Sequence, residues 1–551
     1  MAQRIIEGRL QNANIGLEGD RAPDFCIIGS GAGGGVCALK LAQAGFDVVL
    51  LEEGPHIPKG QGHGGKCHVR PTFLERESTM IPRLYQEGGG RITTDGGVLV
   101  QQGRCLGGGT SVNWSACLPP PQATLQFWKE HFGLPFDGDS LLPYMEEVVG
   151  YLNIHANDKL NSAARLLRDG CTKLGWDWAV LPNNTVHCRE CGSCGTGCAY
   201  DRKQSGIVTW LADAVENPGA QGRPITIYTD AKVYLMDRDK GKIRGVHARF
   251  QGHTSQDTRF RLSVWPKLGV ILSAGSVGTP SILLRSGINP NRQVGKHTHI
   301  HPVTICYGRY PEATHAAYGV PDNMMSREFA AGPTGYLIET GSFSPVLISL
   351  LTLDFGEDLR RTVRDYFPRG AALYAHNNSG FDLKQPYGRV KLDGNDDPEL
   401  EYKLAPDNQS AMRESLKNMT RIHLKAGAES VYHFTNPSIE IRSESELNKL
   451  DQVSFEPSKT TVVTVHVMGG CRMSDGRLKS VVDPHFRLRG VSNAWVVDGS
   501  VFPTGLGANP QVTIYSLALR AAHLILKHFD REDRFTLPHQ QKGKEAWPWT
   551  Q

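Results

Sequence analysis

Four closely spaced cysteines are the residues in this sequence whose types and spacing point most directly to chemistry. Cys188, Cys191, Cys194 and Cys198 follow the pattern C-x2-C-x2-C-x3-C. This spacing is typical of the iron–sulfur ligands of bacterial ferredoxins, and the intervening glycines let the chain wrap around a cuboidal cluster. Ala199 replaces the proline that usually follows. We predict an iron–sulfur cluster, and leave zinc, or a disulfide or free thiols, open as alternatives.

A glycine-rich turn near the N-terminus has the pattern of a dinucleotide-binding loop. Residues 29–34 form a G-x-G-x-x-G sequence between an expected buried strand, 24–28, and an expected helix, 36–44. Gly31 lets the backbone approach a pyrophosphate, and Gly34 lets helix and strand pack closely, while the helix N-terminus faces the anion. The motif serves both NAD and FAD, so it does not decide between them.

An acidic residue stands where such folds recognise a ribose. The next expected strand, 47–51, ends in Glu52, about 20 residues beyond the glycine turn. A carboxylate at this point can accept hydrogen bonds from the ribose diol. The order of strand, turn, helix, strand and acid makes a dinucleotide site the favoured interpretation.

The composition excludes several classes of protein. The chain has 551 residues, 39% hydrophobic and 21% charged, which excludes a disordered or membrane-spanning protein, and its 61 glycines indicate many tight turns. The net charge of +4 comes from scattered basic residues, so we expect no nucleic-acid partner. With no long apolar run and no export signal, we expect no transmembrane segment and a cytoplasmic location. Peripheral membrane association, or export with a partner subunit, is the alternative.

Four further segments are rich in glycine and small polar residues, and suit loops laid against an extended cofactor. They are Gly103–Trp114; Gly275–Pro280 after an expected strand at 269–273; His466–Met473; and Val497–Pro503, continuing to Gly507–Gln511 before an expected helix at 513–528.

Together with the glycine turn, these segments resemble the glucose–methanol–choline (GMC) family of flavin oxidoreductases, over residues 24–528. Within the family, the sequence is similar to long-chain fatty alcohol oxidases at 107–116, in the cysteine segment before 209–211, and at 294–302. It is also similar, more loosely, to the flavin subunits of sugar and alcohol dehydrogenases that carry an iron–sulfur cluster.

The resemblance implies an α/β fold, in which a Rossmann-type FAD-binding domain is combined with a discontinuous α+β substrate domain. The implied boundaries are 1–120, 206–302 and 456–535 for the FAD-binding domain, 121–205 (with the cysteine segment) and 303–455 for the substrate domain, and 536–551 for a tail. The residues implied to bind FAD are Gly29, Gly31, Ala32, Gly34, Glu52, Arg104, Gly108, Thr110, Asn113, Trp114, Val233, Asp498, Gln511 and Val512.

The resemblance also implies two catalytic residues. Oxidising an alcohol removes a hydroxyl proton and a hydride, and a flavin takes the hydride. His466 occupies the family's position for the proton acceptor, a role that suits histidine because its pKa is close to operating pH. Asn509 is the expected second hydrogen-bond partner of the substrate oxygen, since an amide does not accept a proton at neutral pH.

We therefore expect an FAD-dependent oxidoreductase that converts an apolar primary alcohol into an aldehyde. Electrons would leave through an iron–sulfur cluster to a cytochrome or quinone, or pass directly to dioxygen. The alternatives are a sugar or polyol dehydrogenase that feeds a cytochrome, and a flavoprotein lyase whose FAD is not reduced.

Two segments have open interpretations. The apolar run 345–353 is expected to be a buried strand, with a wall of a substrate tunnel or a membrane-touching patch as alternatives. His297, His299 and His301 alternate like strand residues, and metal binding by them is a minor alternative to a structural connection near the flavin.

Overall fold

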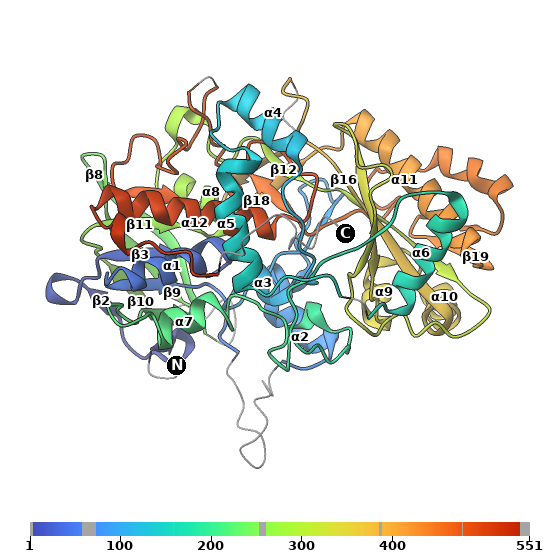
Figure 1. Cartoon of the computed structure of the whole chain (residues 1–551), viewed down its shortest axis with the longest axis horizontal. Coiled ribbons are helices and arrows are strands. Elements are labelled where there is room, and N and C mark those ends of the chain that lie inside the picture. Colours follow the sequence, from blue (N-terminus) through green and yellow to red (C-terminus); the bar gives the residue numbers. More distant parts are fainter. Residues whose placement is uncertain are drawn as a thin grey trace, which may run out of the picture.

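The computed structural model describes residues 4–57, 73–157, 159–252, 260–384, 388–476 and 478–539. Most of the expected tail, residues 540–551, lies outside this range. A parallel sheet with its helices forms one end of the molecule, and a larger, mostly antiparallel sheet forms the other (Figure 1). The functional residues are distributed over both parts.

The first part is built on six parallel strands. Their order is β1 (Ile5–Glu7), β7 (Thr226–Thr229), β4 (Val48–Leu51), β3 (Phe25–Ile28), β11 (Gly269–Leu272) and β23 (Ala494–Val496). The central strands are short apolar runs buried on both faces, as parallel sheets require. The strands expected at 24–28, 47–51 and 269–273 are confirmed to within a residue.

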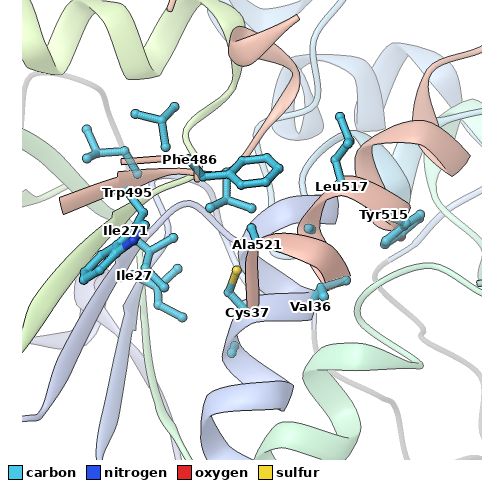
Figure 2. Packing of buried hydrophobic residues seen from close by; sticks show 14 of the residues in the cluster. Ile27, Val36, Cys37, Ile271, Phe486, Trp495, Tyr515, Leu517 and Ala521 are labelled. Atoms are coloured by element: carbon cyan, nitrogen blue, oxygen red, sulfur yellow. The ribbon is translucent and has the colours of Figure 1, made fainter. Parts of the chain in front are cut away.

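Helices and a second small sheet cover the parallel sheet. The helices α1 (Ala32–Gln43), α7 (Trp210–Glu216) and α12 (Gln511–His528) pack together, and in Figure 2 Val36 and Cys37 of α1 lie beside Tyr515 and Ala521 of α12. A four-stranded sheet joins the same core through strands β2 (Ile15–Leu17), β10 (Arg261–Val264), β9 (Lys242–Phe250) and β8 (Ala231–Asp239). This is the predicted Rossmann-type α/β arrangement.

The second part is a nine-stranded sheet whose strands come from distant parts of the chain. Seven strands follow the order β20 (Ile439–Ile441), β19 (Ser430–His433), β13 (Val303–Arg309), β16 (Gly370–Asn377), β15 (Tyr336–Gly341), β14 (Met324–Ser326) and β6 (Ala179–Val180). Two short strands, β21 (Val463–Thr464) and β5 (Leu99–Val100), pair at the side of β13.

Alternating side chains give this sheet two buried faces. On one face, Cys306 and Leu373 pack with helices α6 (Ser162–Leu174) and α11 (Pro406–Lys425). On the other, Ile305 and Tyr374 pack toward helices α9 (Pro345–Leu351) and α10 (Gly356–Tyr366). The two-residue period of the strands therefore divides the apolar residues between two cores.

The expected strand at 345–353 is wrong, because this segment forms helix α9. Ser344 caps the helix by accepting a hydrogen bond from the Leu347 amide (3.3 Å), and Pro345 occupies the first helical turn. Serine followed by proline is a helix start signal, which outweighs the strand preference of the valine and isoleucine that follow. Leu350 is 58% exposed, so the run is not uniformly buried.

Smaller elements connect the two parts. They include helices α2 (Glu77–Leu84), α3 (Gly109–Val112), α4 (Gln122–Phe132), α5 (Gly138–Tyr151) and α8 (Gly275–Arg285), and the strand pairs β12 (Thr298–Ile300) with β22 (Val467–Gly469) and β17 (Gly388–Leu392) with β18 (Pro398–Tyr402). Among the described residues, no helix has both the length and the apolarity needed to cross a bilayer.

Candidate active site

A cavity of about 1210 Å³ is bounded by both large sheets. At one end it is lined by the turns that follow β3 and β4. Along its length it is lined by the loop that precedes β22 and by the N-terminus of α8. At the other end it is lined by Ile305 of β13 and His376 of β16. Parallel strands present their carboxyl ends at a common edge, which is where such folds bind ligands.

The glycine turn is shaped by close backbone contacts. Gly29 has a φ of +97°, and a Cβ there would lie 2.3 Å from the Ser273 carbonyl oxygen. A Cβ on Gly34 would lie 2.0 Å from the Gly29 oxygen, so both positions require glycine. At Gly31, by contrast, a Cβ would have no atom within 4 Å, and this residue lines the cavity. The open space at Gly31 is therefore available to a ligand.

Glu52 lines the cavity but also braces the turn. Its carboxylate accepts hydrogen bonds from the Ser30 amide (3.0 Å), the Ser30 hydroxyl (2.5 Å) and the Gly54 amide (2.8 Å). The Ser30 oxygen accepts in turn from the Gly107 amide (2.9 Å), which ties the 103–114 segment to the turn. Burial raises the pKa of Glu52 to about 7, although these hydrogen bonds oppose the shift.

Most residues implied to bind FAD lie on the cavity wall. These are Gly29, Gly31, Ala32, Glu52, Arg104, Gly108, Thr110, Asn113, Trp114, Val233, Asp498 and Gln511. Two, Gly34 and Val512, lie behind the wall, where Gly34 packs against the turn and Val512 is fully buried. Within the wall, Asn113 donates to the Gln511 side-chain oxygen (2.9 Å).

Asp498 joins two segments of the wall. Its carboxylate accepts from the Gly275 amide (2.9 Å), the Thr279 hydroxyl (2.6 Å) and the Ser500 amide (2.9 Å). The N-terminus of α8 is thereby fixed to the turn at residues 499–501. Burial raises the pKa of Asp498, and the three hydrogen bonds oppose that rise.

The two predicted catalytic residues lie together at the far end of the cavity. His466 and Asn509 both line it. Pairing of β12 with β22 places His301 beside His466, and their Nδ1 atoms are 3.1 Å apart. The ring of His376, from β16, stacks on His466 with 4.6 Å between centroids. Three imidazoles from separate segments therefore meet where one was predicted.

A buried carboxylate, not predicted from the sequence, organises this group. Glu339 of β15 is fully buried, and its Oε2 lies within hydrogen-bond distance of His376 Nε2 (3.2 Å), Tyr374 Oη (3.1 Å) and Asn509 Nδ2 (3.3 Å). Although burial alone would raise the pKa of Glu339, the charge of His376 and these hydrogen bonds hold it below the ordinary value. Single polar residues inside apolar strands were the signal available in the sequence.

Two other titratable groups of this end have pKa values shifted toward their neutral forms. Withdrawal from water, and then the neighbouring His376 and His301, lower the pKa of His466 well below its ordinary value. Burial, and then Glu339, raise the pKa of Asp322 well above its ordinary value. Glu339 is therefore the residue that carries negative charge at this end of the cavity.

Hydrogen bonding assigns a tautomer to His301. The Gly507 amide, which can only donate, lies 3.1 Å from His301 Nε2, so neutral His301 carries its hydrogen on Nδ1 and donates it to His466 Nδ1. Neutral His466 then carries its own hydrogen on Nε2. Buried Nδ1 of His376 has no hydrogen-bond partner among the described residues.

Within the described residues, His301, His376 and His466 are also the one group whose ligand atoms lie close enough for a metal, within 4.8 Å of one another. Four of their six ring nitrogens are engaged with Gly507, with Glu339 and with each other, which suits hydrogen bonding. His299 points to the Pro503 carbonyl oxygen (3.1 Å), so the minor alternative of a site at 297–301 is not supported.

The cysteine segment borders the same cavity. Cys188, Cys191, Cys194 and Cys198 are all free, and they are near enough that each sulfur adds to the burial-driven rise in the pKa of Cys194. Sulfur accepts backbone hydrogen bonds at Cys188, from the Glu190 amide (3.3 Å), and at Cys198, from the Arg202 amide (3.2 Å). Tetrahedral zinc would hold its sulfurs about 4 Å apart, and these four are not so close in the described structure.

A buried lysine links this segment to the cavity wall. Lys203 is 1% exposed, and its ammonium donates to the carbonyl oxygens of Ser111 (3.0 Å), Asn113 (2.6 Å) and Cys194 (3.0 Å). Gly195, next to Cys194, lines the cavity itself and accepts a hydrogen bond from the Tyr85 hydroxyl (2.8 Å). Cys194 is thus next in sequence to a residue of the cavity wall.

Family models match most of the chain. Two parts of a model described as GMC oxidoreductase match residues 81–303 and 384–518, and a model described as an NAD(P)-binding Rossmann-like domain matches residues 27–64. The chain belongs to the GMC oxidoreductase family. The predicted family and the predicted class, an FAD-dependent oxidoreductase, are thereby confirmed.

Individual proteins agree with this assignment. This GMC oxidoreductase is 27% identical to the long-chain-alcohol oxidase FAO3 of Arabidopsis thaliana, over 90% of this chain and 66% of that protein, so it spans about two thirds of the length of that relative. Its fold is similar to pyridoxine 4-oxidase from Mesorbium loti (18% identity, TM-score 0.66, covering 92% and 99% of the two chains). It is also similar to a formate oxidase variant from Aspergillus oryzae RIB40 studied for FAD modification (16% identity, TM-score 0.70, covering 95% and 100%).

The residues of this GMC oxidoreductase fit FAD. An elongated dinucleotide needs a wall without side chains at its pyrophosphate, and Gly31 provides open space there. It also needs polar groups along its length, and the buried hydroxyl of Ser276, on the cavity wall, has no partner among the described residues. A flavin in this cavity would bring the chemistry of hydride acceptance to the histidine end.

Substitution of two glycines separates ligand binding from folding. In Gly31→Ala the added methyl meets no protein atom, and the φ of −65° suits alanine, so we expect a folded protein whose affinity for FAD falls at least about tenfold. In Gly34→Ala the methyl collides with the Gly29 oxygen, so folding itself should be impaired. Circular dichroism and the FAD content per chain measure the two effects; full FAD content in Gly31→Ala would contradict this role.

Proposed function

We propose that this GMC oxidoreductase uses FAD to oxidise an apolar primary alcohol to an aldehyde. The observation that carries the proposal is that His466 and Asn509 line the same cavity as the glycine turn and are joined through Glu339 and His376. We keep the division into FAD-binding and substrate domains, with the boundaries given above, as part of this proposal. The long-chain-alcohol oxidase named among the relatives supports an alcohol as substrate.

The wall of the chamber supports an apolar substrate. Side chains of Val303, Ile305, Phe343, Leu347 and Leu351 line the cavity on the side of the nine-stranded sheet and α9. Burying a hydrocarbon chain against such residues is favourable by about 25 cal/mol per Å². A sugar or polyol would leave hydroxyl groups facing apolar side chains, which is unfavourable without hydrogen-bond partners. Activity as a sugar or polyol dehydrogenase is therefore the weaker alternative.

FAD, when bound, supplies the acceptor for the hydride that leaves the alcohol carbon. The chain's own residues handle the hydroxyl group. Asn509 is oriented by Glu339, which accepts from its Nδ2 (3.3 Å) and leaves its buried Oδ1 without a partner among the described residues. The second hydrogen of Asn509 Nδ2 is available for donation to the substrate oxygen, which holds the alcohol beside His466 and leaves the hydroxyl hydrogen for that histidine.

We propose that His466 is the proton acceptor. Its low pKa keeps it unprotonated and ready to accept at neutral pH. Acceptance at Nε2 requires His466 and His301 to exchange tautomers, which releases the Gly507 contact with His301 Nε2. The competing acceptor is His376, whose Nδ1 has no hydrogen-bond partner among the described residues and whose Nε2 lies 3.2 Å from Glu339 Oε2.

The pair His376–Glu339 has a distinct part in this proposal. Glu339 Oε2 lies 3.2 Å from His376 Nε2, and the ring of His376 stacks on His466, where it is one of the causes that lower the pKa of His466. His376 and Glu339 are thus positioning residues, which keep His466 free of a proton until the alcohol arrives.

Replacement of His466 tests the assignment of the proton acceptor. We expect His466→Ala to retain FAD while reduction of the flavin by n-octanol, followed anaerobically by loss of the oxidised flavin absorbance, slows by about 10²- to 10⁴-fold. His376→Ala is the matched variant and should slow reduction less. Should His376→Ala abolish reduction while His466→Ala leaves it near normal, the roles would be reversed; failure of every alcohol to reduce the wild-type flavin would favour the lyase alternative.

The pH dependence of Glu339→Gln distinguishes the two histidines. Glutamine keeps an acceptor for Asn509 and Tyr374 but removes the negative charge beside His376. Positive charge on the ring of His376 is one of the causes of the low pKa of His466, and without the carboxylate that attracts this charge we expect the pKa of His466 to rise. We expect the acid limb of flavin reduction to move up by about one pH unit. A limb that moves down would assign the proton acceptor to His376 itself, and an unmoved limb would contradict both roles.

We further propose that the four cysteines hold an iron–sulfur cluster, which would carry single electrons from the flavin to a cytochrome or quinone; without it, dioxygen is the acceptor. The buried ammonium of Lys203 supports this proposal, because its hydrogen-bond partners among the described residues are all carbonyl oxygens and because it lies near several cysteines. Anionic sulfur ligands would compensate its charge. Amide hydrogen bonds to two of the sulfurs, and contact of Gly195 with the cavity, also support it.

Metal content tests the cluster directly. In protein purified without oxygen we expect at least about two iron atoms and a similar amount of acid-labile sulfide per chain. Cys194→Ser should lose both, whereas Cys306→Ala, a control for a buried cysteine outside the segment, should keep both. Less iron, or zinc in its place, would end the cluster proposal and leave dioxygen as the acceptor.

A further inference from the structure

A second cavity, of about 700 Å³, lies apart from the residues of the proposed flavin site. Five cationic side chains line it, Arg238, Arg292, Lys296, Arg389 and Arg489, and its described lining contains no carboxylate. Concentration of one sign of charge in a concave site focuses the electric field and attracts ions of the opposite sign. Its volume is within the range of small-molecule sites.

None of the five cations is neutralised by a described carboxylate. Arg238 donates to the Gly490 carbonyl oxygen (3.1 Å), and Arg489 donates to the Ser480 hydroxyl (2.9 Å) and the Ser474 carbonyl oxygen (2.6 Å). The remaining three, at positions 292, 296 and 389, make no side-chain hydrogen bond or ion pair with any residue the structure describes. By comparison, Arg244 on neighbouring β9 is paired with Asp239 (3.6 Å). Five like charges in one hollow repel one another, and an anion would relieve this repulsion.

The floor of the pocket is apolar. Leu284 and Pro290 line it and are partly exposed, and the buried Ile288, Val294 and Val390 lie in the same lining. An inorganic anion would make no use of this surface, whereas a hydrocarbon or ring attached to the anion would cover it. The combination of a cationic rim with an apolar floor therefore matches an amphiphilic ligand.

Helix α8 forms a wall common to both cavities. Leu284 faces the cationic pocket, whereas Ile282 and Arg285 line the flavin cavity. In addition, Val390 packs in one cluster with Val277, which lines the flavin cavity near the α8 N-terminus. A ligand in the cationic pocket would therefore lie one layer of side chains from the flavin site.

We propose that this pocket binds a small amphiphilic anion, namely a carboxylate or a phosphate monoester attached to a hydrocarbon chain or ring. The ligand's charged group contacts Lys296 and Arg389, and its apolar part lies on the floor. This site is independent of the function proposed above, since none of its residues takes part in the handling of the alcohol.

Calorimetric titration of the FAD-loaded enzyme with n-hexyl phosphate tests the proposal. We expect saturable binding that weakens with added salt, and at least tenfold weaker binding in the double variant Lys296→Gln, Arg389→Gln. Arg361→Gln, which removes a surface charge on α10, is the control and should bind as wild type. Reduction of the flavin by n-octanol should be unchanged in the double variant. This result would exclude misfolding, or a change in the flavin cavity, as the cause of weaker binding.

Four binding results would contradict the proposal or part of it. Absence of binding to the wild-type enzyme, or equal binding by the double variant, would overturn the proposal. Inorganic phosphate that binds as tightly as n-hexyl phosphate would overturn the assignment of the apolar floor. Tight binding of n-hexyltrimethylammonium, the cation of similar shape, would show that charge does not select the ligand.

Discussion

The carboxylate of Glu339 is a charge without access to water, and the catalytic end of the cavity is arranged around it. An ionised carboxylate in a protein interior is strongly unfavourable unless hydrogen bonds and an opposite charge compensate it. Here a phenol and an imidazole from strand β16, and an amide from the turn before α12, all converge on one oxygen. Because each of these groups must face Glu339, the orientation of Asn509 and the stacking of His376 on His466 follow from a single buried charge.

The two sheets have different tasks in forming the site. In the parallel sheet, turns at the carboxyl ends of the strands bring backbone amides and glycines to the cavity, which suits an extended anionic cofactor. In the nine-stranded sheet, one face contributes side chains instead, with apolar residues on β13 and polar ones on β16. A redox site needs one surface that follows a cofactor closely and another that distinguishes between substrates. His466 lies where these two surfaces of the cavity meet.

The parts of the site that could be predicted from the sequence are those that depend on local geometry. The turn at residues 29–34 needs glycine because neighbouring backbone atoms approach within the space of a Cβ, and such a requirement is visible in a short motif. Glu339 and His376 were not predictable, because strand pairing between β15 and β16 brings them together over a long separation in sequence. Helix α9 was mistaken for a strand because its apolar run has no period, and only the Ser344 cap indicates a helix.

The position of Lys203 bears on why the cysteine segment and the cofactor wall are neighbours. A lysine ammonium with 1% exposure loses its hydration, and the three carbonyl oxygens around it provide dipoles but no net negative charge. Burial lowers the pKa of Lys203, and the nearby cysteines are the groups that oppose this. Two of the carbonyl oxygens belong to Ser111 and Asn113, in the loop that faces the flavin cavity. Negative charge on the sulfurs favours the charged form of Lys203, and the charged lysine holds this loop by its hydrogen bonds. The structure of the cofactor wall is in this way coupled to the chemical state of the cysteines, even though no cysteine of the segment lines the cavity within the described residues.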